Sequence, residues 1–132
     1  MEKLSANTNA LNWFEIPVTD TVRAKKFYET IFDIKMETQE MMGMEMTMFP
    51  FDMQATNGKV SGALVKGQMH KPGMDGPILY LNANPTIQTV IDKILKAGGK
   101  VLMPKTQISE QIGYMAIFAD TEGNRIALHA GK

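Results

Sequence analysis

The stretch "NWFEIPVTDTVRAKKFYETIF" (residues 12–32) decides the fold. Its first seven residues alternate between the two faces expected of a half-buried β-strand, and the rest carries apolar residues at helical spacing. The helical residues are Phe27, Tyr28, Ile31 and Phe32. Thr19 or Asp20 precedes them as a candidate helix cap. The stretch therefore predicts a strand followed by an amphipathic helix.

The same order occurs again in the second half of the chain. A second strand pattern, "PILYLNA" (77–83), is followed by "NPTIQTVIDKILKAGG" (84–99), in which Asn84 is the candidate cap and Pro85 takes the first helical position. Its expected apolar stripe consists of Ile87, Val90, Ile91, Ile94 and Leu95. Two turn glycines, Gly58 and Gly123, are 65 residues apart, as are Val18 and Ala83. The chain is therefore predicted to repeat one unit.

Each half has room for further strands after its helix. The patterns are "IKMETQE" (34–40), "MEMTMFP" (44–50) and "VSGALV" (60–65) in the first half, and "KVLMP" (100–104), "GYMAIFAD" (113–120) and "NRIALH" (124–129) in the second. Each half is predicted to form a strand, a helix and three strands, over about residues 11–66 and 76–131. The linker, residues 67–75, is rich in glycine and proline, and we expect its His70 to be solvated and without a role.

These motifs resemble the vicinal oxygen chelate superfamily, which holds glyoxalase I, extradiol dioxygenases and bleomycin-resistance proteins. The resemblance is carried by "FEIPVTDTVRAKKFYETIF" (14–32), "YLNANPTIQTVIDKILKAGGKVLMPKT" (80–106), "DTEGNRIALH" (120–129) and "VSGALV". It implies a single α+β domain over residues 1–132, with two βαβββ modules that form an eight-stranded open cup, and a homodimer. Asp33 departs from the pattern, because similar sequences usually carry glycine there.

Alternation along the strands predicts which side chains face into such a cup. Phe14, Ile16 and Val18 are expected against the first helix, so their neighbours face the cup. The expected inward residues are Trp13, Glu15, Pro17, Ile78, Tyr80, Asn82, Ala127 and His129.

The resemblance also implies where a metal would bind, with one ligand from the first and last strand of each module. These positions fall on Trp13, Ile78 and Ala127, and the fourth lies near Gly62, where the alignment can shift to Ser61 or Ala63. Indole, aliphatic and methyl groups offer no donor to a divalent ion, so we expect no metal and no other cofactor. A weak displaced site at Glu15 and His129 stays open as an alternative.

Several inward residues are candidates for binding or chemistry. A desolvated Glu15 is a candidate general base or acid with His129 or Tyr80 as its partner, and the alternative is an ion pair with Lys105 or Arg125. His129 is either a proton shuttle or a terminal histidine that contacts backbone. The expected ligand-binding set is Trp13, Glu15, Met46, Met48, Ile78, Tyr80, Lys105, Ala127 and His129.

Composition excludes other classes of function. Fourteen basic residues balance fourteen acidic ones, which disfavours nucleic acid as a partner. No apolar run reaches the ~20 residues of a membrane span, and the absence of cysteine favours a cytoplasmic protein without disulfides. Twelve methionines, six of them within residues 41–53, suit either a core or the wall of an apolar pocket.

The sequence therefore predicts a metal-free protein that binds a small, partly apolar or aromatic molecule. Whether it is an enzyme stays open: one alternative is a metal-independent lyase or isomerase with Glu15 as base. A divalent-metal lyase or dioxygenase and a purely structural role are disfavoured alternatives.

Overall fold

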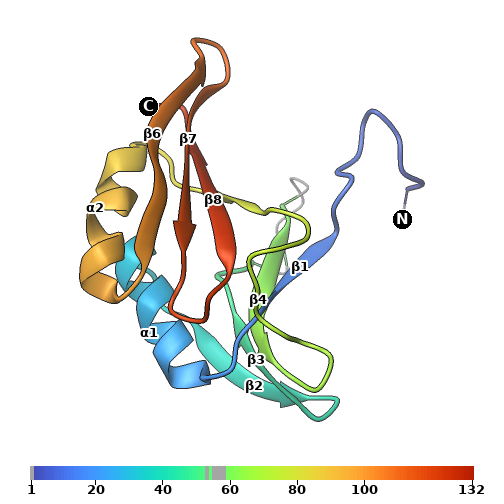
Figure 1. Cartoon of the computed structure of the whole chain (residues 1–132). Helices are drawn as coiled ribbons and strands as arrows, with labels where there is room; N and C mark the ends of the chain where they lie inside the picture. The colour runs from blue at the N-terminus through green and yellow to red at the C-terminus, as the bar shows by residue number, and fades with distance from the viewer. Residues whose placement is uncertain (1, 53, 55–58) are drawn as a thin grey trace.

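The computed structural model describes residues 2–52, 54 and 59–132, so Met53 and the turn at Gly58 lie outside the described residues. Within that part of the chain the order βαβββ occurs twice, which confirms the predicted repeat (Figure 1). The first module consists of β1 (Trp13–Pro17), α1 (Thr21–Phe32), β2 (Glu37–Met41), β3 (Met44–Met48) and β4 (Ser61–Lys66). The second consists of β5 (Tyr80–Asn82), α2 (Ile87–Ala97), β6 (Lys100–Ser109), β7 (Gly113–Ala119) and β8 (Arg125–Ala130).

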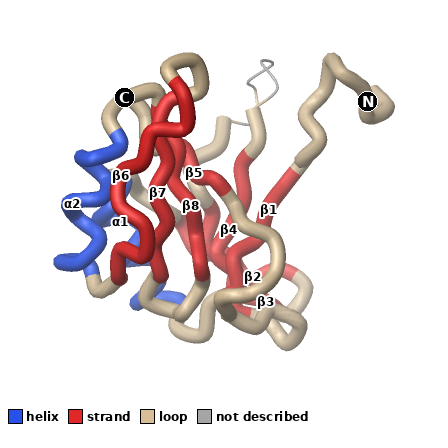
Figure 2. The backbone as a smooth tube through the Cα atoms, turned by 45° about the horizontal axis from the view of Figure 1, so that its top comes forward, coloured by secondary structure: helices blue, strands red, loops and turns tan. Residues whose placement is uncertain are grey.

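The strands form two four-stranded sheets with the same topology. Sheet A has the order β1-β4-β3-β2 and sheet B the order β5-β8-β7-β6 (Figure 2). In each sheet the first strand of the module pairs in parallel with the last, and the other pairs are antiparallel. Among the described strands, none of sheet A has a Cα atom within 8 Å of one of sheet B, so β1 and β5 remain edge strands that do not pair with each other.

The first helix begins and ends where the sequence predicts. Asp20 is its N-cap, and the carboxylate accepts a hydrogen bond from the backbone N–H of Arg23 at 3.0 Å. Asp33 closes the helix with φ 52° and ψ 54°, in the left-handed region that usually favours glycine. The departure from glycine at this position therefore leaves the helix end intact.

The second helix corrects three sequence predictions. It begins at Ile87 after the cap Thr86, so Pro85 lies before the helix and does not take its first position. Asn84 is not the cap, because its side chain accepts a hydrogen bond from the N–H of Gly131 at 2.8 Å. Leu95 is 75% exposed and lies outside the buried stripe, whereas Ile94 next to it is fully buried.

One hydrophobic core joins both modules through their helices. It contains side chains from both helices and from one face of each sheet, so these elements meet in a common interior. Phe27 of α1 shows the connection, because the centre of its ring lies 5.8 Å from that of Phe118 in sheet B. The predicted stripes thus pack on each other as well as on their own sheets.

Polar contacts from the turn between β7 and β8 also hold the modules together. The hydroxyl of Tyr28 donates to the carboxylate of Asp120 at 2.7 Å in the buried interior. The side chain of Glu122 is fully buried and accepts hydrogen bonds from the N–H groups of Thr19 and Asp20, each at 2.9 Å. Arg23 completes this network with a 2.8 Å ion pair to Glu122.

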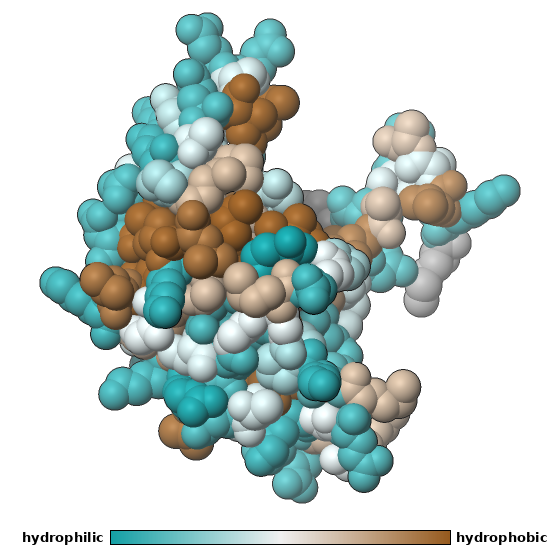
Figure 3. All heavy atoms as spheres, in the orientation of Figure 1, coloured by the Kyte–Doolittle hydropathy of each residue, from teal (hydrophilic) through white to brown (hydrophobic). Residues whose placement is uncertain are grey.

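Each sheet has an open face, which is the face opposite this core. Figure 3 shows apolar side chains gathered over β6, β7 and β8, on the open face of sheet B. Among the described residues, neither helix is long and apolar enough to cross a membrane.

Candidate functional site

The open face of sheet A carries the first half of the predicted site. Ile16 is buried in the shared core, so Trp13 and Glu15 lie on the opposite face, as predicted. Beside them a second apolar cluster is formed by Met46, Ala63 and Val65, flanked by Trp13, Met44 and Met48. Met46 is therefore buried in a cluster separate from the main core, and only the flanking Met44 and Met48 are partly exposed.

Glu15 is bound by a residue that the sequence predicted to have no role. Its carboxylate lies 2.7 Å from Nε2 of His70 and accepts a longer hydrogen bond, 3.3 Å, from the indole N–H of Trp13. The side chain of His70 is only 16% exposed, so the prediction that it is solvated is wrong. The expected partners Lys105, Arg125, Tyr80 and His129 make no described contact with Glu15.

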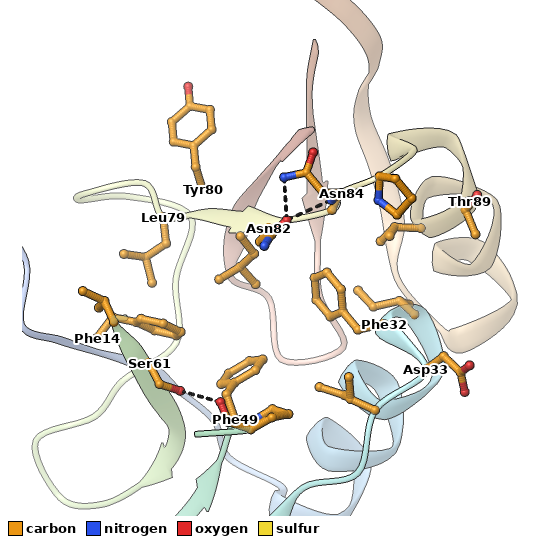
Figure 4. A pocket seen from close by; sticks show the side chains of 18 of the residues that line it. Phe14, Phe32, Asp33, Phe49, Ser61, Leu79, Tyr80, Asn82, Asn84 and Thr89 are labelled. Atoms are coloured by element: carbon orange, nitrogen blue, oxygen red, sulfur yellow. Dashed lines mark hydrogen bonds between the residues drawn. The ribbon is translucent and has the colours of Figure 1, made fainter. Parts of the chain in front are cut away.

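The open face of sheet B carries the second half. Strand pairing places Tyr80 opposite Ala127, and Asn82 opposite His129, on the face away from the core. Nε2 of His129 lies 2.6 Å from the carbonyl oxygen of Ile112, which matches the interpretation of His129 as a histidine that contacts backbone. Tyr80 is 52% exposed, and its ring points away from the neighbouring groove (Figure 4).

The two charged candidates, Lys105 and Arg125, lie on opposite faces of sheet B. The ammonium of Lys105 lies 4.4 Å from the ring centre of Tyr114, which packs against the shared core, so Lys105 does not face the open side of sheet B. Arg125 lies on that open face, where its guanidinium donates to the carbonyl of Gly76 at 2.7 Å. Lys105 therefore does not lie with the other predicted ligand-binding residues on the open face of sheet B.

A groove of about 850 Å³ lies between the two modules on the other side of the strands. Its walls include Phe14, Phe32, Phe49, Ile78, Leu79 and Asn82 (Figure 4). Ile78 also lines this groove but precedes β5, so it is not part of the regular strand on which the sequence pattern placed it. Of the predicted ligand-binding residues that the structure describes, only Ile78 and Tyr80 line it, so the groove and the open faces are separate features.

Strand pairing identifies the residue at the fourth position implied for a metal. Glu15 pairs with Ala63, and Tyr80, its equivalent 65 residues later, pairs with Ala127. Ala63 is therefore the counterpart of Ala127, and both are fully buried. Gly62 faces the other way, where an added Cβ would overlap Phe14.

The side chains at these four positions do not fit a divalent ion. Trp13, Ile78, Ala63 and Ala127 provide no carboxylate, imidazole or thiolate. Among the described residues, no three His, Cys, Asp or Glu side chains are grouped to hold a metal. Glu15 and His129 also belong to different sheets, and His129 is engaged with backbone.

Comparison with known proteins agrees with this architecture. The model of the Glyoxalase/Bleomycin resistance protein/Dioxygenase superfamily matches residues 10–128. A putative glyoxylase, CFP32, from Mycobacterium tuberculosis is 29% identical over 119 residues, which cover 89% of this chain and 44% of that protein. The chain thus spans less than half the length of this relative. A glyoxylase-like domain-containing protein from Didymella fabae is 28% identical over 123 residues, covering 89% of this chain and 91% of the relative.

Solved structures share the fold at low identity. A glyoxylase/bleomycin resistance protein/dioxygenase domain from Frankia superposes with a TM-score of 0.69 at 14% identity, over 96% of this chain and all of that one. TnmS3, an antibiotic binding protein from Streptomyces, superposes with a TM-score of 0.66 at 21% identity, over 97% of this chain and all of that one. The chain belongs to the Glyoxalase/Bleomycin resistance protein/Dioxygenase superfamily.

Proposed function

We propose that this protein binds a small, partly apolar or aromatic organic molecule without a metal ion. The molecule would lie between the open face of sheet A in one copy of the chain and the open face of sheet B in a second copy. One observation carries the proposal: all four positions that the family pattern assigns to metal ligands hold side chains without suitable donor atoms. The surrounding surface combines an indole, methionines and a half-exposed tyrosine, which suit apolar and planar ligands. That TnmS3 is described as an antibiotic binding protein is compatible with such a role.

The proposal includes a homodimer, because one chain does not close the site. Among the described residues, the apolar cluster on the open face of sheet A contains none of sheet B, and the edge strands β1 and β5 are unpaired with each other. The strand residues on the two open faces also differ in charge. Glu15 and Glu37 lie on that of sheet A, whereas Lys100 and Arg125 lie on that of sheet B. Sheet A of one copy facing sheet B of a second copy would pair these opposite charges.

The oligomeric part is tested by sedimentation of the full chain at two salt concentrations. We expect a dimer that weakens as salt rises, and weakens further in Glu37→Lys and in Lys100→Glu, because each reversal removes a complementary charge. Mixing the two variants should restore part of the association. A monomer at all concentrations, or a dimer insensitive to both reversals, contradicts this arrangement.

Ligand binding is tested with protein purified without chelator. Elemental analysis should show no stoichiometric divalent metal, and a thermal-shift screen of small organic molecules should identify compounds that raise the melting temperature. Binding is then followed through the fluorescence of Trp13, the single tryptophan. Tyr80→Ala should weaken binding, whereas Phe51→Ala, a similarly exposed aromatic outside the site, serves as the matched control. A stoichiometric metal, or a broad panel with no binder, contradicts the proposal.

A metal-independent lyase or isomerase is the second candidate, and the Glu15–His70 hydrogen bond favours it. A histidine within 2.7 Å of a carboxylate is an arrangement used for proton transfer. If the protein turns over a bound compound, Glu15→Gln should abolish turnover while the fold, measured by circular dichroism, is retained. An unchanged rate would remove this candidate and leave the binding proposal in place.

A further inference from the structure

The linker between the modules is fastened to both halves of the protein. Residues 67–79 (the strap) leave β4 and pass in front of β1 and β4 in the view of Figure 1. Four polar contacts hold the strap: His70 with Glu15 (2.7 Å), Gly73 N–H with Asn124 (3.1 Å), Gly76 carbonyl with Arg125 (2.7 Å), and Leu79 carbonyl with the N–H of Ala127 (2.8 Å). The strap therefore spans from the open face of sheet A to that of sheet B.

At its first contact the strap lies directly on the proposed binding surface. Glu15 and Met44 both belong to the open face of sheet A, and His70 and Gly67 of the strap lie over them. A Cβ added at Gly67 would come within 2.9 Å of the Met44 side chain and 3.1 Å of Nδ1 of His70. A residue larger than glycine would force one of these side chains to shift, so the strap packs closely on Met44 at this end of the surface.

The closed strap leaves two polar atoms without partners. Nδ1 of His70 and Nε of Arg125 are both buried without a hydrogen bond, and among the described residues only one other side-chain atom, Oγ1 of Thr21, is in this state. A buried donor or acceptor that lacks a partner opposes the closed arrangement, because water would satisfy it on opening. The same two residues thus both fasten the strap and limit the stability of its closed form.

From these contacts we infer that the strap is a lid over the Glu15 end of the binding surface, and that the Glu15–His70 hydrogen bond is its latch. Glu15 stays partly exposed in the closed form, so the movement of His70 would free the remaining, covered part of Glu15 and Met44 for a ligand. This inference rests on the proposed function for the identity of the site, but the movement of the strap is measurable without any ligand.

The test uses Trp13, whose indole donates to Glu15 next to the latch. In His70→Ala, acrylamide quenching of Trp13 and hydrogen exchange of the strap amides should both increase, the latter about tenfold or more, as expected for one lost hydrogen bond to a charged group. Met69→Ala is the matched control, because Met69 lies in the same turn and is 94% exposed. It should leave both measurements unchanged.

A conservative variant separates the latch from a general loss of packing. The amide of His70→Gln can still donate to Glu15, so this variant should keep the strap closed. Glu15→Ala, which removes the acceptor, should increase exchange of the strap amides about as much as His70→Ala does. If His70→Ala fails to fold, the comparison of Glu15→Ala with His70→Gln decides the question. The inference is overturned if Glu15→Ala leaves the exchange of the strap amides unchanged, or if Met69→Ala opens the strap to the same degree. Because these readouts need no ligand, they are independent of whether the small-molecule screen succeeds.

Discussion

Glu122 should be the side chain on which the attachment of the two modules depends most strongly. Burial alone would raise the pKa of its carboxyl group, but hydrogen bonds from Arg23, Asp20 and Thr19 outweigh burial and lower the pKa to about 2. Replacing Glu122 by glutamine keeps the size of the side chain and removes the charge. The amide of the glutamine would then place an N–H group against donors that already point toward this position.

The expected loss follows from the difference in pKa between the folded and unfolded states. A shift from 4.5 to about 2 corresponds to at most about 3.5 kcal/mol, at ~1.4 kcal/mol for each unit. The side chain of Arg23 is half exposed, so screening reduces the contribution to roughly 2 kcal/mol. In Glu122→Gln we therefore expect the melting temperature at pH 7 to fall by about 6 to 10 °C.

The pH dependence gives this prediction a sign. Because the folded-state pKa is lowered, the contribution of Glu122 is fully present above about pH 5 and is lost as the pH falls toward 2. The difference between wild type and Glu122→Gln in urea unfolding should therefore shrink steadily between pH 5 and pH 2. Glu110→Gln, at an exposed position in another turn, is the control and should change stability by less than about 0.5 kcal/mol. Equal stability of Glu122→Gln and wild type at pH 7, or a difference that does not change with pH, would refute the reasoning.

Three further substitutions test the core and the backbone by urea unfolding. Tyr28→Phe should cost about 1 to 2 kcal/mol, because it removes the buried 2.7 Å hydrogen bond to Asp120; an unchanged midpoint would contradict this. Gly62→Ala should cost about 2 kcal/mol or more, because its Cβ would overlap the carbonyl and ring of a phenylalanine in β1. Its control is Gly73→Ala, where no described atom lies within 4 Å and stability should stay within about 0.5 kcal/mol. Asp33→Gly should stabilise the protein by about 0.5 to 1 kcal/mol, since Asp33 has φ 52°, and any destabilisation would count against the strain argument.

Strand faces could be predicted from the sequence because alternation is a local property. Once Ile16 is assigned to the core, Trp13 and Glu15 must face the other way, and the structure places them so. The same rule places Tyr80 and His129 correctly in sheet B. The rule does not extend to Ile78, because the strand β5 begins only at Tyr80 and side chains alternate regularly only within a strand.

The partner of Glu15 could not be predicted in the same way. His70 lies 55 residues further along the chain in a segment without a repeating pattern, and composition indicates only that such a segment is irregular. A glycine- and proline-rich linker usually runs exposed over the surface, which makes a solvated histidine the expected outcome. The one local signal in the sequence is Gly67, three residues earlier, which leaves room for the linker to lie directly on Met44.

The arrangement of the two modules follows from what the apolar stripes of α1 and α2 pack against. The sequence predicts that each stripe packs on its own sheet, which would leave the two inward faces free to meet in one cup. In the structure, α1 and α2 also pack on each other, and the ring of Phe27 reaches Phe118 of the other module. The helix-facing side of each sheet thus packs in the shared core. The open face of each sheet is left without a partner from the other sheet of the same chain. The strap covers part of that face in sheet A at Glu15, and a second copy of the chain is the proposed cover for the remainder, because its open face carries the opposite charge.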